Sequence, residues 1–186
     1  ILFRLVGSEM CIRDRDSTLC ELELVQIFSE ALTALGVPGF RIQINDRRLL
    51  QALALLGGVT EAQFTDWTVA VDKLDKVGVD GVIREFEERG LPKSAAAQLP
   101  ELVALRDHKD PMAALDALAT LLEGHASGES ALANVRDLIS RAVNTGVNLD
   151  ALRMDPLLAR GLDYYTGAIF EVLSLIHISE PTRRKR

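Results

Sequence analysis

The long middle of the chain carries one helical pattern after another, and this stretch limits the fold class. From Arg47 to about Asn148, apolar residues recur at helical spacing. The pattern is interrupted at Gly57-Gly58, Gly78, Gly90-Leu91-Pro92, Asp110-Pro111, Ser127-Gly128 and Gly146. Before it, Phe40, Ile42 and Ile44 alternate with polar residues, which is typical of a half-buried strand. The sequence therefore predicts an α+β fold in which a helical module interrupts a sheet-containing domain.

Further elements are predicted on both sides of this module. Ser17 is placed to cap a helix that runs to about Leu35 and ends at Gly36. After the module, residues 152–162 are expected to be extended, and residues 164–172 are expected to form a second strand.

Both ends of the chain can be encoded by a single DNA element read in opposite orientations. Leu5–Arg15 and Leu173–Arg183 are translations of its two strands. The element resembles the adaptor that is joined to DNA fragments when a sequencing library is made by transposition. We therefore expect residues 1–15 and 173–186 to be non-native and exclude them from fold prediction. The alternative for 183–186, a basic tail that binds nucleic acid, has less support.

Without these ends the chain is strongly acidic. The whole sequence has 21 Lys and Arg against 27 Asp and Glu; the ends hold 7 and 3 of them, which leaves 14 against 24 in residues 16–172, a net charge of −10. A general phosphate-binding surface is therefore not expected, and contact with RNA would need a local basic patch or parts of the protein outside this chain. Cys20 is the one cysteine outside the ends, so a disulfide framework or zinc cluster is not predicted. No apolar run has the length of a membrane span, and a reducing cytoplasm is compatible with this composition.

One short run of residues is typical of a binding site. It places an arginine, an aspartate and two tyrosines where two extended segments would meet, which packing alone does not require: Arg160-Gly161-Leu162-Asp163-Tyr164-Tyr165-Thr166-Gly167. A guanidinium donates paired hydrogen bonds to carboxylate or phosphate, and a phenol stacks on or hydrogen-bonds an aromatic ring.

Structural alternatives to each of these roles stay open. Arg160 can instead pair with Asp163 or Glu171. Adjacent strand residues face opposite sides, so Tyr164 and Tyr165 reach one ligand together only at an irregularity, and one of them can be a core residue. Asp163 either orients Arg160 or caps a turn, and Gly161 and Gly167 indicate a turn or close backbone approach.

This run resembles the histidine-binding motif of the histidyl-tRNA synthetase family. Two more matches follow the family's order and approximate spacing, Ile44-Asn45-Asp46-Arg47-Arg48-Leu49 and Val71-Asp72-Lys73-Leu74-Asp75-Lys76. The resemblance covers residues 16–172 and is closer to the eukaryotic-type branch. It implies a class II synthetase catalytic domain, built on an antiparallel sheet, with a mostly helical insertion. Residues 16–46 and 151–172 would belong to the catalytic domain and 47–150 to the insertion. The dimer-forming motif, the ATP motifs and the anticodon-binding domain of the family have no match, so an internal fragment is expected.

The resemblance also implies an activity and its substrates. The parent would be a histidine–tRNA ligase that uses ATP, with Mg²⁺, to form histidyl-adenylate and transfers histidine to its tRNA; it would be a cytoplasmic homodimer, and the isolated fragment would be inactive. Arg160 would contact the histidine carboxylate and the α-phosphate and stabilise the transition state, and Tyr164 and Tyr165 would bind histidine, Tyr165 more directly. Gly161, Asp163 and Gly167 would support the loop.

Two other functions, in different classes, remain as alternatives. One is a non-catalytic paralogue that regulates ATP phosphoribosyltransferase in histidine biosynthesis, and the other is an interaction module that kept only the helical insertion. The intact Arg160 run favours the synthetase over both.

Other charged residues are expected to play smaller parts. The charges of Asp72–Lys76 are predicted to form a solvated helix face. Arg47 and Arg48 are expected to pair with Asp46 and Asp150 rather than with RNA phosphates. His108 and His125 are predicted to be surface residues, and no metal site is indicated.

Overall fold

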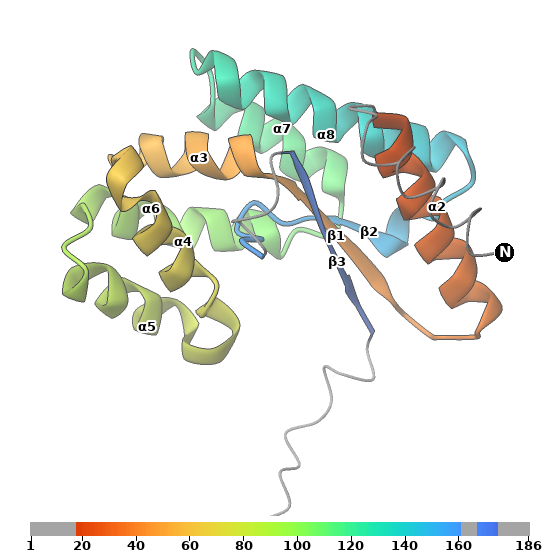
Figure 1. Cartoon of the computed structure of the whole chain (residues 1–186), viewed down its shortest axis with the longest axis horizontal. Helices are drawn as coiled ribbons and strands as arrows, with labels where there is room; N and C mark the ends of the chain where they lie inside the picture. Colours follow the sequence, from red (N-terminus) through yellow and green to blue (C-terminus); the bar gives the residue numbers. More distant parts are fainter. Residues whose placement is uncertain (1–17, 161–166, 175–186) are drawn as a thin grey trace, which may run out of the picture.

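The structure, a computed structural model, describes residues 18–160 and 167–174. Helices and a small sheet share one hydrophobic core (Figure 1). In chain order the elements are α2 (Thr18–Ala34), β1 (Arg41–Asp46), α3 (Arg47–Leu56), η1 (Glu61–Gln63), α4 (Phe64–Val71), α5 (Leu74–Glu88), α6 (Lys93–Arg106), α7 (Pro111–Leu121), α8 (Ala126–Asn144), η2 (Leu149–Ala151), β2 (Leu152–Met154) and β3 (Ala168–Leu173). The predicted α+β class is confirmed.

The sheet has β1 at its centre, in the order β2-β1-β3. β1 and β3 are antiparallel, with Gln43 opposite Glu171, whereas β1 and β2 are parallel, with Gln43 opposite Arg153. A parallel pair needs a long crossover connection, and the helices α3 to α8 provide it (Figure 1). The described sheet is therefore mixed, where the resemblance implied an antiparallel one.

The helices between β1 and β2 bury their apolar faces together with the sheet. The core contains residues from α3, α4, α5, α7, α8 and all three strands, with these among its largest members: Trp67, Phe86, Ile42, Ile44, Leu49, Leu50, Leu53, Leu115 and Leu118. α3 crosses α8 so closely that a Cβ on Gly128 would lie 2.9 Å from the Cβ of Ala52. Glycine is therefore required at this crossing. The division of the chain into a catalytic piece and an inserted module stays a prediction, because the core is continuous across it.

Local sequence explains where the helices around the site begin. The Asp46 carboxylate accepts the N–H of Arg48 at 2.8 Å and caps α3 directly at the end of β1. Asp110 caps α7 in the same way, with Pro111 as the first helical residue. Gly78, with φ of +70°, interrupts α5 with a kink.

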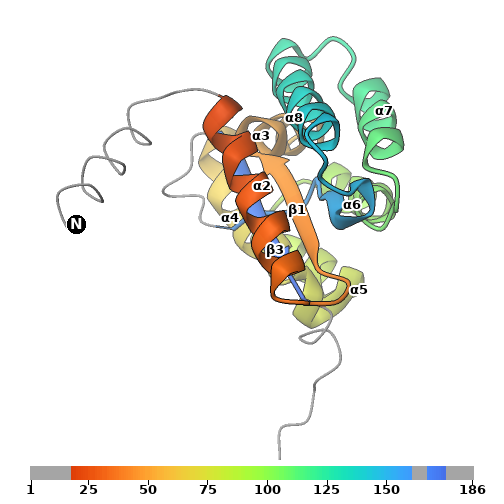
Figure 2. The same cartoon turned by 90° about the vertical axis from the view of Figure 1, so that its right-hand side faces the viewer.

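The predicted helix before the sheet is confirmed, but its packing differs from the pattern. α2 packs against α8, and Leu22 and Val25 are buried. Figure 2 shows α2 at the near side of the fold, in front of β3. Ile27 and Phe28 of this helix are 59% and 39% exposed. Helical periodicity identified the element correctly, but it did not show which of its apolar residues would meet a packing partner among the described residues.

The first of the two later strands is shorter than predicted, and residues 164–166, the predicted start of the second, lie outside the described residues. β2 ends at Met154, because the chain turns at Pro156–Leu157, where the N–H of Leu158 donates to the Asp155 carbonyl at 3.1 Å. The prediction that residues 152–162 are extended throughout is therefore wrong. β3 begins at Ala168 and ends at Leu173, the first residue of the end that we predict to be non-native. The origin of both ends stays a prediction, since residues 1–17 and 175–186 lie outside the described part.

Within the described residues, the structure contains no helix with the length and apolar composition needed to cross a membrane.

Candidate functional site

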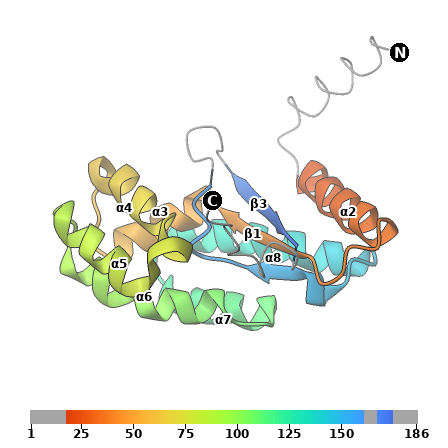
Figure 3. The ribbon, with the colours of Figure 1, turned by 90° about the horizontal axis from the view of Figure 1, so that it is seen from below.

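Arg160 lies at a small cavity where the sheet meets the helices. Seen from below in Figure 3, the segment after β2 returns toward the junction of α4 and α5, beside β1 and β3. The cavity has a volume of about 20 Å³ and is lined by Gln43, Asp72, Arg106, Asp155, Arg160 and Glu171, among others. This volume has room for about one water molecule. Charged groups of both signs thus converge from four separate elements.

Two carboxylates contact the Arg160 guanidinium. Its Nε lies 3.1 Å from Oε1 of Glu171 on β3 and 3.8 Å from Oδ1 of Asp72, which links α4 to α5. The Arg160 side chain is 50% exposed, so solvent screens both ion pairs and their contribution to stability is small. The pairing with Glu171 is the one that the sequence left open as an alternative to catalysis. It is compatible with either role, because a guanidinium has several donors.

Beneath Arg160, a buried carboxylate holds the turn that follows β2. Asp155 is 3% exposed, its Oδ1 accepts the N–H of Leu157 at 2.9 Å, and its own N–H donates to the carbonyl of Ile44 at 3.1 Å. Burial raises the pKa of Asp155 to about 6, while the charge of Arg106 and the hydrogen bond from Leu157 oppose the rise. The carboxylate thus holds the start of the segment that leads to Arg160.

Arg106, at the end of α6, connects this turn to the helices. Its Nε lies 3.2 Å from Oδ2 of Asp155, and its Nη2 lies 2.6 Å from Oδ1 of Asp75. Burial would lower the pKa of Arg106, but the charges of Asp155 and Asp75 raise it above its usual value. Arg106 is therefore a fixed cation between the two carboxylates.

Asn45 of β1 holds the other end of the same turn. The Asn45 side chain is fully buried, and its Nδ2 donates to the carbonyl of Leu158 at 3.2 Å. Its Oδ1 is the buried side-chain atom without a hydrogen-bond partner among the described residues, which is unusual in a protein interior. Asn45 and Asp155 together fix the backbone that leads into Arg160.

The structure locates only part of the predicted site. Gly161, Asp163, Tyr164 and Tyr165 lie outside the described residues, so their roles stay predictions. The carbonyl of Gly167 accepts the N–H of Arg47 at 2.9 Å. A Cβ at Gly167 would meet only Oε1 of Glu21, at 3.8 Å, so the described residues do not crowd this position.

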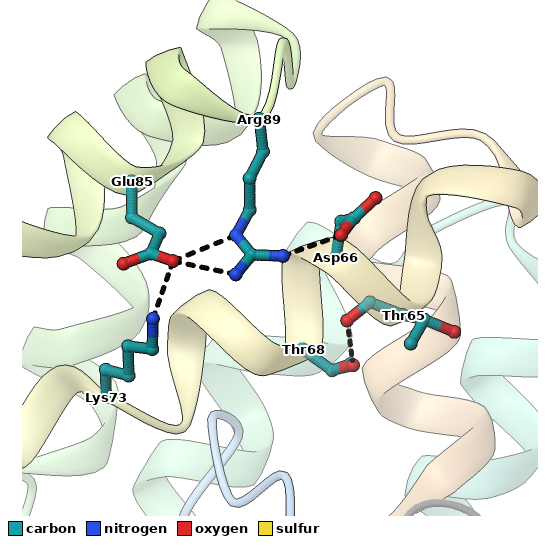
Figure 4. A network of polar contacts seen from close by, with 6 residues as sticks. All are labelled: Thr65, Asp66, Thr68, Lys73, Glu85 and Arg89. Atoms are coloured by element: carbon teal, nitrogen blue, oxygen red, sulfur yellow. Dashed lines mark hydrogen bonds and ion pairs between the residues drawn. The ribbon is translucent and has the colours of Figure 1, made fainter.

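Three of the charged residues in the Asp72–Lys76 segment, Asp72, Lys73 and Asp75, form ion pairs. Asp72 contacts Arg160 and Asp75 contacts Arg106. Nζ of Lys73 lies 2.6 Å from Oε1 of Glu85. The same carboxylate oxygen accepts hydrogen bonds from Nε and Nη2 of Arg89, whose Nη1 donates to Asp66 (Figure 4). The hydrogen bonds from Lys73 and then Arg89 lower the pKa of Glu85. The prediction of a plain solvated face therefore missed two contacts at the site, through Asp72 and Asp75.

The remaining charged residues lie largely as predicted. Arg48 pairs with Asp46, with Nη2 and Oδ2 separated by 2.7 Å. The guanidinium of Arg47 lies 5.8 Å from the ring centre of Phe64, a cation–π contact in place of the predicted ion pair. His108 is exposed and His125 precedes α8. The described residues contain no group of three or more His, Cys, Asp or Glu side chains arranged to hold a metal ion.

Comparison with known proteins identifies the family. The family model described as histidyl-tRNA synthetase matches residues 6–176, a range that overlaps both predicted non-native ends. The chain is 37% identical over 153 residues to the histidine–tRNA ligase of Flavobacterium johnsoniae, covering 82% of the chain and 31% of that protein. It is 38% identical over 162 residues to the histidine–tRNA ligase of Bacteroides fragilis, covering 86% of this chain and 34% of that protein. The chain thus spans about a third of the length of these relatives.

Solved structures show the same fold. A histidyl-tRNA synthetase from Nostoc aligns with a TM-score of 0.79 and 24% identity, over 88% of this chain and 38% of that one. A Bacillus halodurans protein described as an ATP phosphoribosyltransferase regulatory subunit/histidyl-tRNA synthetase aligns with a TM-score of 0.68 and 21% identity. The alignment covers 86% of this chain and 40% of that one. Because the family model covers most of the sequence and Arg160 lies at a charged cavity of the same fold, the chain belongs to the histidyl-tRNA synthetase family.

Proposed function

We propose that this chain is a part of the catalytic region of a histidine–tRNA ligase. In this reaction a carboxylate oxygen of histidine attacks the α-phosphorus of ATP, so that a bond forms between them and pyrophosphate leaves. A hydroxyl of the terminal adenosine of the tRNA then attacks the carbonyl carbon, and AMP leaves. Both the carboxylate and the phosphate are anionic, so the first step requires a fixed cation between them.

Arg160 is the residue that we assign to this step. Its guanidinium carries a positive charge and has donors for both oxygen groups. The observation that carries the assignment is its place: it is half exposed at a cavity between sheet and helices, on a backbone held by Asp155 and Asn45. Tyr164 and Tyr165 are proposed to bind the histidine side chain, Tyr165 more directly, and Gly161, Asp163 and Gly167 to support the loop.

The other substrates and partners follow from the family. ATP and histidine tRNA are proposed as substrates of the full-length synthetase, meaning the protein that carries residues 16–172 within its own reading frame. Mg²⁺ is proposed from the family alone, and we assign no residue of this chain to it. Homodimerisation and a cytoplasmic location are likewise proposed from the family, and the isolated chain is expected to be inactive.

Histidine-dependent exchange of pyrophosphate into ATP tests this proposal. The full-length synthetase should catalyse exchange with histidine on the order of 10⁴ times better than with amino acids that lack the imidazole, because buried polar partners left unpaired reject analogues strongly. The regulatory paralogue remains the second candidate. It would show no exchange with any amino acid and would instead raise the activity of ATP phosphoribosyltransferase.

A further inference from the structure

The guanidinium of Arg160 needs something other than packing to hold it in one place. An arginine side chain carries about 2 kcal/mol of rotamer entropy, and half of the Arg160 side chain is exposed. The backbone that leads to Arg160 is fixed from below by Asp155 and Asn45, but these contacts end at Leu158. The direction of the side chain itself is therefore set by groups that touch the guanidinium.

Among the described residues, two carboxylates from different parts of the fold do so. Glu171 lies on β3, paired with Gln43 of β1, and its side chain is 24% exposed. Asp72 lies between α4 and α5, and its side chain is 40% exposed. The shortest contact of each is with Nε, the nitrogen nearest the aliphatic stem. Because a guanidinium is planar and rigid, restraining Nε also orients the two terminal nitrogens.

We propose that Glu171 and Asp72 are positioning residues, which hold Nε of Arg160 so that its terminal nitrogens are ready for the histidine carboxylate and the α-phosphate. This inference rests on the proposed function. Glu171 is the main contact, at 3.1 Å, and Asp72 is a weaker one, at 3.8 Å. Asp72 belongs to the helical region, so the site would depend on how those helices sit against the sheet.

A competing role for the same carboxylates makes the opposite prediction. If Glu171 occupied the guanidinium in place of substrate, removing its charge would free Arg160, and the KM for histidine would fall with kcat unchanged. If Glu171 positions Arg160, removing its charge leaves the guanidinium free to sample several rotamers. The fraction of enzyme in the productive geometry then falls, and kcat falls with it.

The test uses Glu171→Gln and Asp72→Asn in the full-length synthetase, assayed by histidine-dependent pyrophosphate exchange. Both variants keep the shape of the side chain and remove its charge. We expect kcat to fall about 10-fold for Glu171→Gln, which corresponds to about 1.4 kcal/mol, and about 3-fold for Asp72→Asn, with smaller changes in KM. Glu171→Asp, which keeps the charge, should recover part of the loss. The exposed residues Glu123 and Asp80 provide matched controls as Glu123→Gln and Asp80→Asn.

A double-mutant cycle separates positioning from a general structural effect. In an Arg160→Ala background, Glu171→Gln should not lower kcat any further, because no guanidinium is left to hold. Three results would overturn the inference and leave the proposed function standing. They are a fall in kcat from Glu171→Gln that persists in the Arg160→Ala background, activity of the Glu171 and Asp72 variants equal to that of the controls, and a fall in KM alone. Absence of histidine-dependent exchange in the wild type would remove the proposed function and this inference with it.

Discussion

Replacing Arg160 with alanine in the full-length synthetase is expected to lower kcat for histidine-dependent pyrophosphate exchange by a factor on the order of 100 to 1000. This is the usual cost of removing one charge-stabilising donor from a reacting centre, about 3–4 kcal/mol. Arg160→Lys keeps the charge but loses the planar fork, so it should recover only part of the rate. Measurement at saturating histidine and ATP isolates the effect on kcat.

Arg136 is the matched control for Arg160. Arg136 forms a surface ion pair with Asp116, at 2.6 Å, on helices away from the cavity, and Arg136→Ala should leave kcat unchanged within a factor of about two. If both Arg160 variants turn over within a few-fold of wild type while the KM for histidine rises, Arg160 binds the ground state and does not stabilise the transition state.

The second large effect concerns the buried carboxylate of Asp155. Burial raises its pKa to about 6, above the value of about 4 in an unfolded chain. Between these values the folded chain holds a proton on Asp155 that the unfolded chain has lost, so the contribution of Asp155 to the free energy of unfolding falls as the pH rises from about 4 to 6 and then stays level. The groups that act on Asp155 are Arg106 and the N–H of Leu157, which oppose the rise, and Asp75 and Glu171, which add to it.

Asp155→Asn removes this pH dependence. The free energy of unfolding of the wild type, minus that of the variant, should fall by up to about 3 kcal/mol between pH 4 and pH 7. In the variant Arg106 loses one of its two carboxylate partners and keeps Asp75, and this cost is the same at every pH because arginine stays charged. Denaturant unfolding of this chain at several pH values measures the difference, with the surface variant Asp116→Asn as the control. A difference that rises with pH would mean that the ion pair with Arg106 outweighs burial.

Patterns within short windows predicted the elements of this fold well. The helix before Gly36 and the alternation at Phe40–Asn45 correspond to α2 and β1 within a residue or two, because both periodicities are local. The parallel pairing of β2 with β1 could not be predicted in this way. It joins Ile42 to Leu152, and such a contact depends on how all the intervening helices pack. The exposed side of α2 was missed for the same reason.

The site was predicted in part. The Arg160 run predicts a binding site without any tertiary information, because so many polar and aromatic residues in a short segment are unusual in a core; that role stays a prediction. Arg106, Asp75 and Asp155 were missed, because they come together only when α6 packs against the turn after β2. One signal was available: Asp155 is a lone carboxylate in an apolar run from Leu152 to Leu158 that also holds Arg153, and a charge in such a setting is usually paired.

We propose that Arg160, held by Glu171 and Asp72, is the group on which histidine and ATP react. The most direct measurement is a crystal structure of the full-length synthetase with a non-hydrolysable histidyl-adenylate analogue. The terminal nitrogens of Arg160 should lie about 3 Å from the ligand's carbonyl and phosphate-equivalent oxygens, while Nε keeps its contacts with Glu171 and Asp72. A bound analogue with the Arg160 guanidinium beyond hydrogen-bond reach of every ligand atom would contradict it.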